Sequence, residues 1–407
     1  MRISTHQMQQ NAVNTMLKQH GNLSRTQQQV ATGQRVFKPS EDPVSASRVV
    51  NLKDTLAGIE QFQSNIDAAR ARITLAEGVL ENVVEALHRV RELAVQANND
   101  SQNESTRLFI SEEVEQILDE LISLANTTDS NNEYLFSGSL SRFKPFSRNE
   151  SGGFDYNGDE NNREIQISRT RRIRVDDSGA DVFLTIKNGN GIFSTTNGTS
   201  NQGTGMIDPG RASGKFVEDT YAIVFHKIAT AQGQVDIPTT YSVVNSSGEI
   251  LKSNVPYQPG KEIEFNGVHT SVKGDPENDD YFVIEPSRNQ NMFATVNDLV
   301  NALAGKTPDV SDKISFHNKM NRVLTDLTQS LDNVLVVRGN IGGRLNALDS
   351  QETINDAYRL QIKEILSGVE DLDFAEAVSR LNLQLTGLEA AQKAFTRVQD
   401  ITLFNYI

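Results

Sequence analysis

Hydrophobic positions repeat with a helical period toward both ends of this 407-residue chain and change to a strand-like pattern in its middle. The clearest stripe runs from Ile59 to Ala97 in alternating steps of three and four, which places its members on one face of a helix. Val79, Val84 and Leu93 widen this stripe beyond the narrow seam of a two-stranded coiled coil. The pattern therefore predicts a long helix packed within a multi-helix bundle.

A second helix is predicted after the polar break at 98–103. Its seam consists of Ile110, Val114, Ile117, Leu121 and Leu124. Ser101 and Glu104 have the spacing of a capping box, so this helix is expected to begin there.

A third helical stripe extends from Met320 to Leu348 and continues from Tyr358 to Leu372 after a phase shift, which we interpret as a stutter. Three glycines at 339, 342 and 343 lie inside this stripe. Glycine in a helix costs about 1 kcal/mol relative to alanine. The cluster therefore indicates either a close helix approach or kink, or a break between two helices.

The two chain ends carry weaker versions of the same pattern. The heptad positions are Val13, Met16, His20, Leu23, Gln27 and Val30 near the start, and Val378, Leu381, Leu385, Leu388, Gln392 and Phe395 near the end. Polar residues interrupt both seams, and we interpret His20 as a seam residue that tunes register. Isolated helices of this kind bury little apolar area, so we expect them to be mobile in the monomer and to fold against partners.

Between Arg142 and Val300, turn-forming residues separate short β-prone runs, which is typical of an antiparallel β domain. The runs predicted as strands are 164–167, 182–187, 221–225, 239–244, 263–268 and 281–284. The low-complexity stretch from Gly189 to Gly214 is predicted to be a mobile loop.

Together these patterns predict an α+β multidomain protein. Long N- and C-terminal helices form a helical bundle or coiled-coil rod, and an antiparallel β domain is inserted between them. The predicted division assigns 1–45 plus 375–407 to terminal coiled-coil helices, 46–140 plus 301–374 to the bundle core, and 141–300 to the β-rich domain.

Charge and composition narrow the range of partners. The chain carries 53 acidic and 39 basic residues, and its net charge of −14 argues against nucleic acid or an anionic membrane as the main partner. Cysteine is absent, so the chain has no disulfide framework and no thiolate nucleophile. No stretch approaches the roughly 18 apolar residues of a membrane span, and the polar first thirty residues are unlike an ordinary secretory signal peptide.

No group of residues has the pattern of a catalytic or metal site, so we expect no catalytic residues, no metal ligands and no cofactor. The six histidines share no ligand spacing. Asp155–Asn161 resembles a calcium loop, but Glu160 replaces the required glycine and Gln166 the bidentate glutamate, so a solvated turn is expected. The acidic run Asp275–Asp280 is expected to be a turn between two strands.

Short motifs near both ends of the chain form an ordered set. They are Met1–Thr5, Ala31–Pro43 followed by Val44–Val49, Asn132–Gly138 and Leu403–Ile407. This set resembles the bacterial flagellin superfamily. The Pro-Ser-acidic-Asp-Pro form at 39–43 is similar to the hook-associated protein 3 branch of hook–filament junction proteins, with Glu41 where that branch often has aspartate. The middle of the chain resembles the family more loosely, through 259–265 and 281–287.

The resemblance implies a structural role without enzymatic activity. Members of this branch form a layer of like subunits, a ring, between the first hook–filament junction protein and the flagellin filament. They are exported unfolded through the flagellar type III channel, and a dedicated export chaperone holds the C-terminal helix beforehand. The resemblance thus implies a secreted, extracellular flagellar subunit. Its partners would be the first junction protein, flagellin, like subunits and a chaperone, without nucleic acid or membrane.

The terminal arms are the predicted assembly interface. Val13, Met16, Leu23 and Val30 are expected to pack against Leu381, Leu385, Leu388 and Phe395, and Leu403 and Phe404 complete the predicted set. A filament flagellin is the alternative within the same class. A cytosolic coiled-coil scaffold would share the heptads and the acidic charge, and a hydrolase built on the β domain is disfavoured because no paired base and nucleophile is found.

Overall fold

The computed structural model describes residues 5–36, 38–150, 152–227, 238–307 and 309–400. The chain forms two compact units. Unit 1 comprises Met1–Asn65, Ile167–Arg169 and Asp349–Ile407, and unit 2 comprises Ile66–Gln166 and Thr170–Leu348. Two long helices, α2 (Pro43–Ala97) and α5 (Val310–Glu370), contribute residues to both units.

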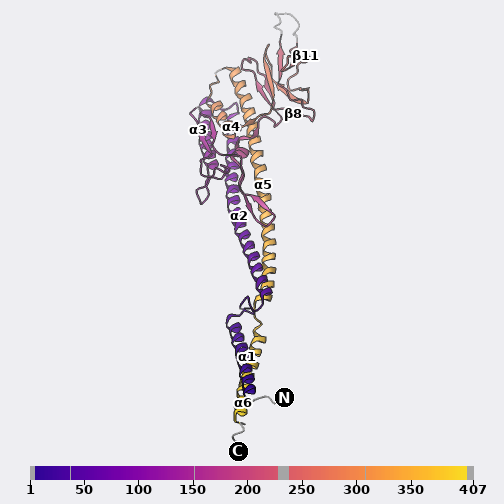
Figure 1. The fold of residues 1–407 in the computed structure, drawn as a ribbon. Helices are drawn as coiled ribbons and strands as arrows, with labels where there is room; N and C mark the ends of the chain where they lie inside the picture. The colour runs from indigo at the N-terminus through magenta and orange to yellow at the C-terminus, as the bar shows by residue number, and fades with distance from the viewer. Residues whose placement is uncertain (1–4, 37, 151, 228–237, 308, 401–407) are drawn as a thin grey trace, which may run out of the picture. The chain divides into compact units, whose positions relative to one another are not determined.

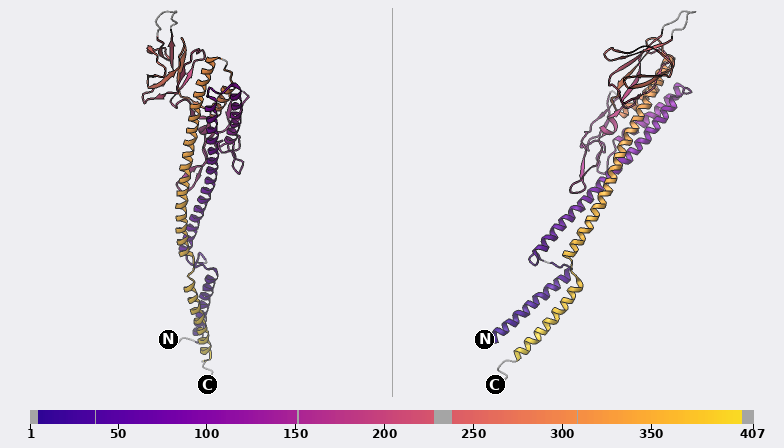
Figure 2. Two further views of the ribbon diagram at one scale, coloured as in Figure 1. Left: turned by 180° about the vertical axis from the view of Figure 1, so that it is seen from behind. Right: turned by 90° about the vertical axis from the view of Figure 1, so that its right-hand side faces the viewer.

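Unit 1 is built from helices that come from both ends of the sequence. Helix α1 (Thr5–Thr32) and helix α6 (Phe374–Asp400) lie side by side and run antiparallel, which can be followed from the indigo and yellow ends of the chain in Figures 1 and 2. The beginning of α2 and the end of α5 complete this unit.

Unit 2 contains the helical bundle. Its helices are the later part of α2, α3 (Glu104–Ala125), α4 (Met292–Ala304) and the earlier part of α5 (Figure 1). Ion pairs join α2 to its neighbours, since Arg89 Nη2 lies 2.6 Å from Glu113 Oε1 of α3 and Arg338 Nη2 of α5 lies 2.6 Å from Glu77 Oε1. The Ser111 hydroxyl of α3 donates to the Val300 carbonyl of α4 at 3.1 Å.

The predicted stripe of α2 is buried throughout the part of the helix that lies in unit 2. The buried stripe residues are Ile66, Ala69, Ile73, Ala76, Leu80, Val83, Leu87, Val90, Ala94 and Ala97. Val79, Val84 and Leu93, which widen the stripe, are buried as well. This width matches a helix that packs on several neighbours rather than on one.

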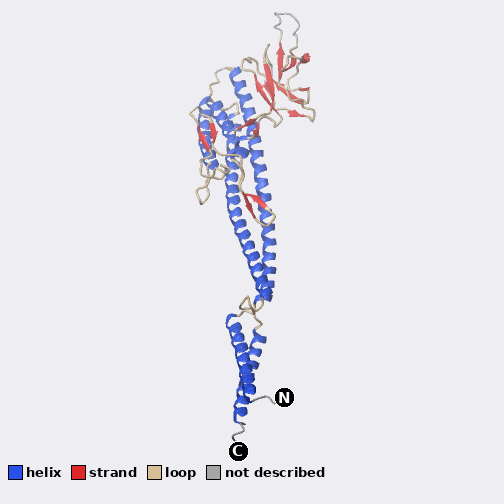
Figure 3. Cartoon of the chain, in the orientation of Figure 1, coloured by secondary structure: helices blue, strands red, loops and turns tan. Residues whose placement is uncertain are grey.

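The β domain of unit 2 is a pair of antiparallel sheets (Figure 3). One sheet has the strand order β11 (Ile250–Pro256), β10 (Thr240–Asn245), β9 (Tyr221–His226), β14 (Tyr281–Pro286) and β6 (Phe193–Asn197). The other has the order β12 (Glu262–Phe265), β13 (Val268–Lys273) and β7 (Met206–Ile207), with β8 (Arg211–Ala212) also paired to β13. Buried residues of both sheets, among them Tyr221, Phe225, Phe265, Val272 and Phe282, form one hydrophobic core.

Among the described residues, three small two-stranded sheets complete the strands. They pair β1 (Phe146–Arg148) with β2 (Phe154–Tyr156), β3 (Glu164–Gln166) with β4 (Arg172–Arg174), and β5 (Ile186–Lys187) with β15 (Asn289–Gln290). A π-helical turn, η1 (Ala180–Leu184), precedes β5. The predicted fold class, terminal helices with an inserted antiparallel β domain, is therefore confirmed. The three-part division of the chain stays a prediction.

Two predictions about the helices were wrong. The N-cap of α3 is Asn103 rather than Ser101, because the Asn103 side chain accepts from the Thr106 amide at 2.8 Å. The three glycines of α5 neither break the helix nor mark a close approach, since α5 continues through them and a methyl group at Gly339, Gly342 or Gly343 would meet nothing within 4 Å.

The apparent stutter in α5 has a different cause from the one predicted. The helix is continuous, and the buried face passes from Leu348 to Gln351 and Asn355 in steps of three and four. These two amides hydrogen-bond each other at 3.0 Å, and Asn355 also donates to the Ile167 carbonyl. Polar residues thus occupy a regular seam, while Tyr358, predicted to lie in it, is 57% exposed.

Three predictions about the middle of the chain were also wrong. The run 182–187 is mostly the π-helical turn η1, with only its end in a strand. The run 263–268 is not one strand but the hairpin of β12 and β13, which turns at Asn266 and Gly267 with positive φ angles of 41° and 81°. The stretch from Gly189 to Gly214 contains the strands β6, β7 and β8 rather than a single loop.

The β domain is fastened to α5 by buried polar contacts. Asp326 Oδ1 accepts from the Gly189 amide at 2.7 Å, and Asn318 accepts from the Ile207 amide and donates to the Gly205 carbonyl. Burial raises the pKa of Asp326 above its ordinary value, and the Gly189 hydrogen bond and the Arg322 charge offset only part of this effect.

Replacing Asp326 by asparagine should stabilise unit 2 at neutral pH. The amide keeps an acceptor for Gly189 and removes the cost of a buried charge. A raised folded-state pKa means that the carboxyl favours folding below its unfolded pKa and loses this contribution as the pH rises through the folded pKa. The advantage of Asp326→Asn should therefore shrink as the pH falls through the folded pKa. Urea unfolding over a pH series measures it, with the exposed Asp332→Asn as control, and an advantage independent of pH would contradict the interpretation.

Alanine should stabilise α5 at its glycines. An added methyl group at Gly343 would meet no other atom within 4 Å. Gly343→Ala should therefore raise the free energy of unfolding by about 0.5–1 kcal/mol, because glycine has a lower helix propensity and a higher entropy in the unfolded chain. Gly138→Ala should have the opposite effect, since Gly138 has a φ of 66° and an added methyl group would collide with Asp159. Denaturant unfolding followed by circular dichroism compares the two, and a destabilised Gly343→Ala variant would refute the account of α5.

Candidate assembly interface

The two terminal arms, α1 and α6, face each other in a fixed register. A methyl group at Gly33 would lie 3.6 Å from the ring of Phe374, and one at Gly387 would lie 3.9 Å from Gln19. Residue numbers on α6 therefore fall as those on α1 rise. The helices from the two ends of the sequence therefore pair in an antiparallel orientation.

The structure brings together one half of the predicted interface. The residues spaced by seven at Met16, Leu23 and Val30 and at Leu381, Leu388 and Phe395 are buried or half-buried. An apolar pocket of about 290 Å³ lies between the first part of α1 and the last part of α6. It is lined by Gln9, Ala12, Thr15, Met16, Ala391, Ala394 and Phe395. Met16 and Phe395 thus share one surface between the arms.

The other half of the predicted interface remains open. Val13 is 40% exposed and Leu385 is 39% exposed, and the positions spaced by seven from them are exposed as well. These positions are His20 and Gln27 on α1 and Val378 and Gln392 on α6. The interpretation of His20 as a seam residue was therefore wrong. We call Val13, Leu17, Val378 and Leu385, all exposed, the open stripe of the arms.

The seam between the arms contains polar residues that the heptad pattern did not identify. Gln19 and Gln384 are half-buried, and their Oε1 atoms accept no hydrogen bond from any residue that the structure describes. A buried acceptor without a partner costs about 1–3 kcal/mol. The sequence contained one signal for these glutamines, because Gln19 lies four residues before Leu23 and Gln384 four residues before Leu388. The heptads through the apolar residues Val13 and Leu385 competed with this register.

A short backbone junction joins the inner ends of the arms. The Arg35 amide donates to the Glu370 carbonyl at 2.8 Å, and the Leu372 amide donates to the Gly33 carbonyl at 2.9 Å. Gly33 ends α1 with a φ of 72°, a conformation that favours glycine. Side chains reinforce the junction, because Glu370 Oε1 accepts from Gln34 at 3.0 Å and from Lys53 at 2.8 Å.

The signature segment that ends at Pro43 starts the next helix. Asp42 Oδ1 accepts from the Ser45 amide at 3.0 Å, and Pro43 occupies the first helical position, where a missing amide costs nothing. Hydrogen bonds from Ser45 lower the pKa of Asp42. Glu41 pairs with Arg25 of α1 at 3.1 Å. The motif therefore caps α2 and links it to α1.

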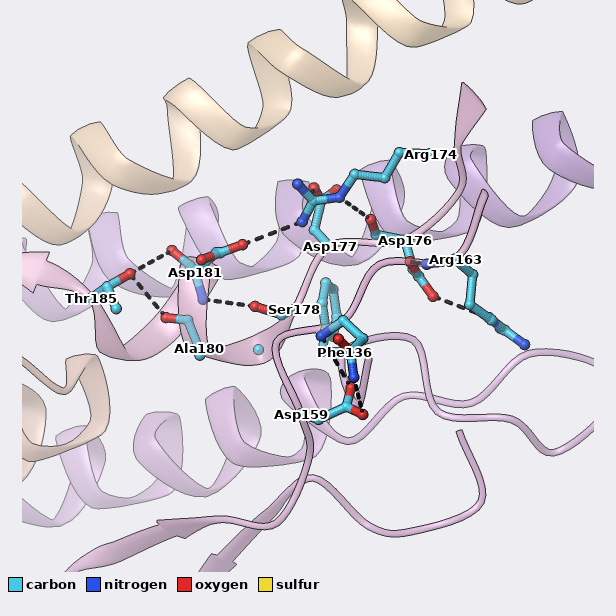
Figure 4. Close-up of polar contacts among 12 residues, drawn as sticks. Phe136, Asp159, Arg163, Arg174, Asp176, Asp177, Ser178, Ala180, Asp181 and Thr185 are labelled. Carbon is cyan, nitrogen blue, oxygen red and sulfur yellow. Dashed lines mark hydrogen bonds and ion pairs between the residues drawn. The ribbon is translucent and has the colours of Figure 1, made fainter. Parts of the chain in front are cut away.

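The second signature segment, Asn132–Gly138, has a structural role in unit 2. Leu135 and Phe136 are buried, and the Phe136 carbonyl accepts from the Gly179 amide at 2.8 Å. Around it, Figure 4 shows Asp159, and also Arg163 and Arg174 paired with carboxylates of the segment Asp176–Asp181. Arg72 of α2 pairs with Asp129 at 2.6 Å, and Glu133 links it to the network, since Glu133 lies 3.7 Å from Arg72 and 2.8 Å from Arg163. These contacts hold the loops of unit 2 on the bundle.

The carboxylates of the two acidic runs accept hydrogen bonds from backbone amides in the part of the chain that the structure describes. Asp275–Asp280 lies between β13 and β14, as predicted, and Asp280 accepts from the amides of Gln202 and Gly203. Asp159 accepts from the Ser139 amide at 2.7 Å rather than facing a common centre with other acids. No group of three or more His, Cys, Asp or Glu among the described residues is arranged to hold a metal ion.

The structure limits what can be said of the C-terminal end and of membrane-spanning helices to the residues that it describes. Leu403 and Phe404 of the predicted interface, with the motif Leu403–Ile407, are outside the described residues. Within the described residues, no helix has both the length and the apolar character needed to cross a membrane.

Known proteins resemble this chain over different parts of its length. The model of the bacterial flagellin N-terminal helical region matches residues 3–141. Flagellar hook-associated protein 3 of Escherichia coli is 24% identical, and the match covers 99% of each chain. Several filament flagellins match less than half of this chain.

Solved structures give the same relationship. Flagellar hook-associated protein 3 of Legionella pneumophila has a TM-score of 0.74 and 33% identity, and the match covers 79% of this chain and 98% of that one. A second structure from this organism, described as the flagellar junction protein FlgL, has a TM-score of 0.71 and 32% identity, with coverage of 81% and 100%. The chain belongs to the flagellar hook-associated protein 3 family.

Proposed function

We propose that this chain is a structural subunit of the bacterial flagellum, placed at the junction between hook and flagellin filament. The observation that carries the proposal is the open stripe of the arms: the paired helices α1 and α6 leave Val13, Leu17, Val378 and Leu385 exposed. Burying an apolar side chain of this size is worth about 1.5–3 kcal/mol. The stripe therefore supplies a driving force for assembly that the single chain does not use.

The predicted interface residues have two roles in this proposal. Met16, Leu23, Leu388 and Phe395 hold the two arms together, and the open stripe meets neighbouring subunits. Leu403 and Phe404 extend the interface at the C-terminal end. Because the arms bury little within one chain, we infer that they become fully ordered only when neighbours cover them.

Membership of the family supports a proposal about the partners. We infer that the chain contacts the first hook–filament junction protein on one side, flagellin on the other, and like subunits within a ring. We also infer that it is secreted through the flagellar type III channel after an export chaperone has held its C-terminal helix. The related proteins are structural components of flagella, and we propose that this chain has no catalytic activity.

Filament flagellin is the second candidate, because the flagellin model matches residues 3–141. The full-length match to hook-associated protein 3 favours the junction role, since the flagellins match less than half of the chain. Growth of long filaments from the purified protein alone would favour flagellin.

Deleting the gene tests the junction role. Cells should carry hooks without filaments and release flagellin into the medium, because nothing then retains filament subunits at the hook. Wild-type protein should restore filaments, whereas Leu385→Asp should not, since it places a charge in the open stripe. Electron microscopy of the cells and immunoblots of the medium measure both results.

The control places the same charge outside the open stripe. Thr386→Asp introduces a carboxylate at an exposed neighbouring position and should restore filaments. Both variants should keep the circular dichroism of the wild-type monomer. Normal filament growth with Leu385→Asp would reject the stripe as the assembly surface, while normal filaments in the deletion strain would reject the junction role itself.

Limited proteolysis of the purified monomer tests the inferred order of the arms. Cleavage should begin before about residue 40 and after about residue 375, because local opening is easiest where few apolar contacts must break. Mass spectrometry of the first fragments locates the cuts. Early cleavage in the β domain with both ends intact would be inconsistent with weakly held arms.

A further inference from the structure

Arginines are concentrated at one place in this acidic chain. Four of the 39 basic residues fall within six positions, at 169, 171, 172 and 174, although acids outnumber bases by 53 to 39. In unit 2, β3 and β4 form a hairpin in which Ile165 lies opposite Ile173 and Gln166 opposite Arg172. Ile173 is buried while Arg172 is exposed, so the two faces of this hairpin differ in character.

Two of these arginines have no ion-pair partner among the residues that the structure describes. Arg174 pairs with Asp181 at 3.2 Å, and Arg169 also interacts within the chain. Arg171 and Arg172 are exposed and form no ion pair with any residue that the structure describes. An arginine carries a fork of donors suited to carboxylates, so these two exposed arginines, consecutive in the sequence, offer a basic surface that fits an acidic one.

An acidic surface of matching size lies on α3, elsewhere in unit 2. Glu112, Glu115 and Asp119 follow one another in steps of three and four and are exposed, so they share one helix face. Leu108, four residues before Glu112, continues this face and is 48% exposed. Glu115 lies 3.9 Å from Arg148, while Glu112 and Asp119 form no ion pair among the described residues.

We propose that Arg171 and Arg172 of one copy of this chain bind the acidic face of α3, formed by Glu112, Glu115 and Asp119, on the neighbouring copy. The inference rests on the proposed function, because it names the contact between like subunits. Charge complementarity identifies the occupant: subunits with a net charge of −14 repel one another, and a contact between them requires a local basic surface. The arginine stems also cover the exposed Leu108.

The contact joins two different surfaces of the same molecule. The strands β3 and β4 and the helix α3 occupy separate parts of unit 2 (Figure 1). An interface between unlike surfaces leaves one of each free on every pair, so it continues from copy to copy and closes into a ring when the rotation permits. This is the geometry that a layer of like subunits needs.

Cross-linking tests the contact directly, because the chain has no cysteine of its own. A variant carrying both Arg172→Cys and Glu115→Cys is expressed as the sole copy in the deletion strain, and isolated hook–filament complexes are treated with a short bis-maleimide. An immunoblot should show a ladder of dimers, trimers and larger products, and either single variant should give none. Dimers alone, or no product in assembled complexes, would overturn the proposal.

Charge reversal provides an independent measurement. Arg171→Glu with Arg172→Glu should reduce the number of filaments per cell by about tenfold. Each exposed ion pair is weak, but these substitutions replace the attraction to the acidic face of α3 by repulsion. Adding Glu112→Arg and Glu115→Arg should restore the filaments. The matched control, Arg142→Glu with Lys144→Glu, makes the same change of charge at two exposed positions that are two residues apart and should have no effect.

The outcomes separate this inference from the junction role. Restoration by the reversed α3 residues supports the contact. Full filament numbers with the reversed arginines, or failure of the α3 reversal to restore them, would overturn it. In both cases complementation by the wild-type chain still reports the junction role, since that result does not involve the substituted residues.

Discussion

The seam between α1 and α6 buries far less apolar surface than the bundle does, and the behaviour of the chain ends depends on this difference. Among the described residues of the two arms, Leu23 and Ala377 are the buried hydrophobic ones, whereas α2 alone has fourteen buried residues. Each buried aliphatic side chain contributes a few kcal/mol at most, and ordering a residue costs about 1–2 kcal/mol. Two arms held so weakly gain most from surfaces supplied by other molecules.

The backbone junction keeps these weak arms in register. The Leu372 amide donates a hydrogen bond to the Gly33 carbonyl, and the Asp42 carboxylate caps the first turn of α2 by accepting from the Ser45 amide. Hydrogen bonds of this kind depend on local geometry rather than on buried area, so they fix the direction of the arms without making the seam strong. The signature segment at 31–43 therefore has a physical role: Gly33 and Arg35 link the two arms, and Asp42 caps α2.

The sequence predicted the strong elements better than the weak ones. The stripe of α2 was predicted residue by residue because apolar side chains repeat without interruption from Ile66 to Ala97. In the arms, two registers compete: the heptads through Val13 and Leu385 overlap those through Leu23 and Leu388, and only packing decides which set is covered. Strands such as β6 were missed because Phe193–Asn197 is polar, and its backbone partners lie far away on β14.

Apolar and charged surfaces have separate tasks in the proposed assembly. An apolar stripe lowers the free energy when it is covered, but it is nearly indifferent to rotation and sliding, because the hydrophobic effect has no direction. Charged pairs contribute little net affinity at an exposed site, yet a wrong alignment sets like charges against each other. Because the chain has a net charge of −14, we propose that the positions where Arg171 and Arg172 can meet carboxylates define the allowed arrangement. The arms then supply the driving force, and unit 2 selects the geometry.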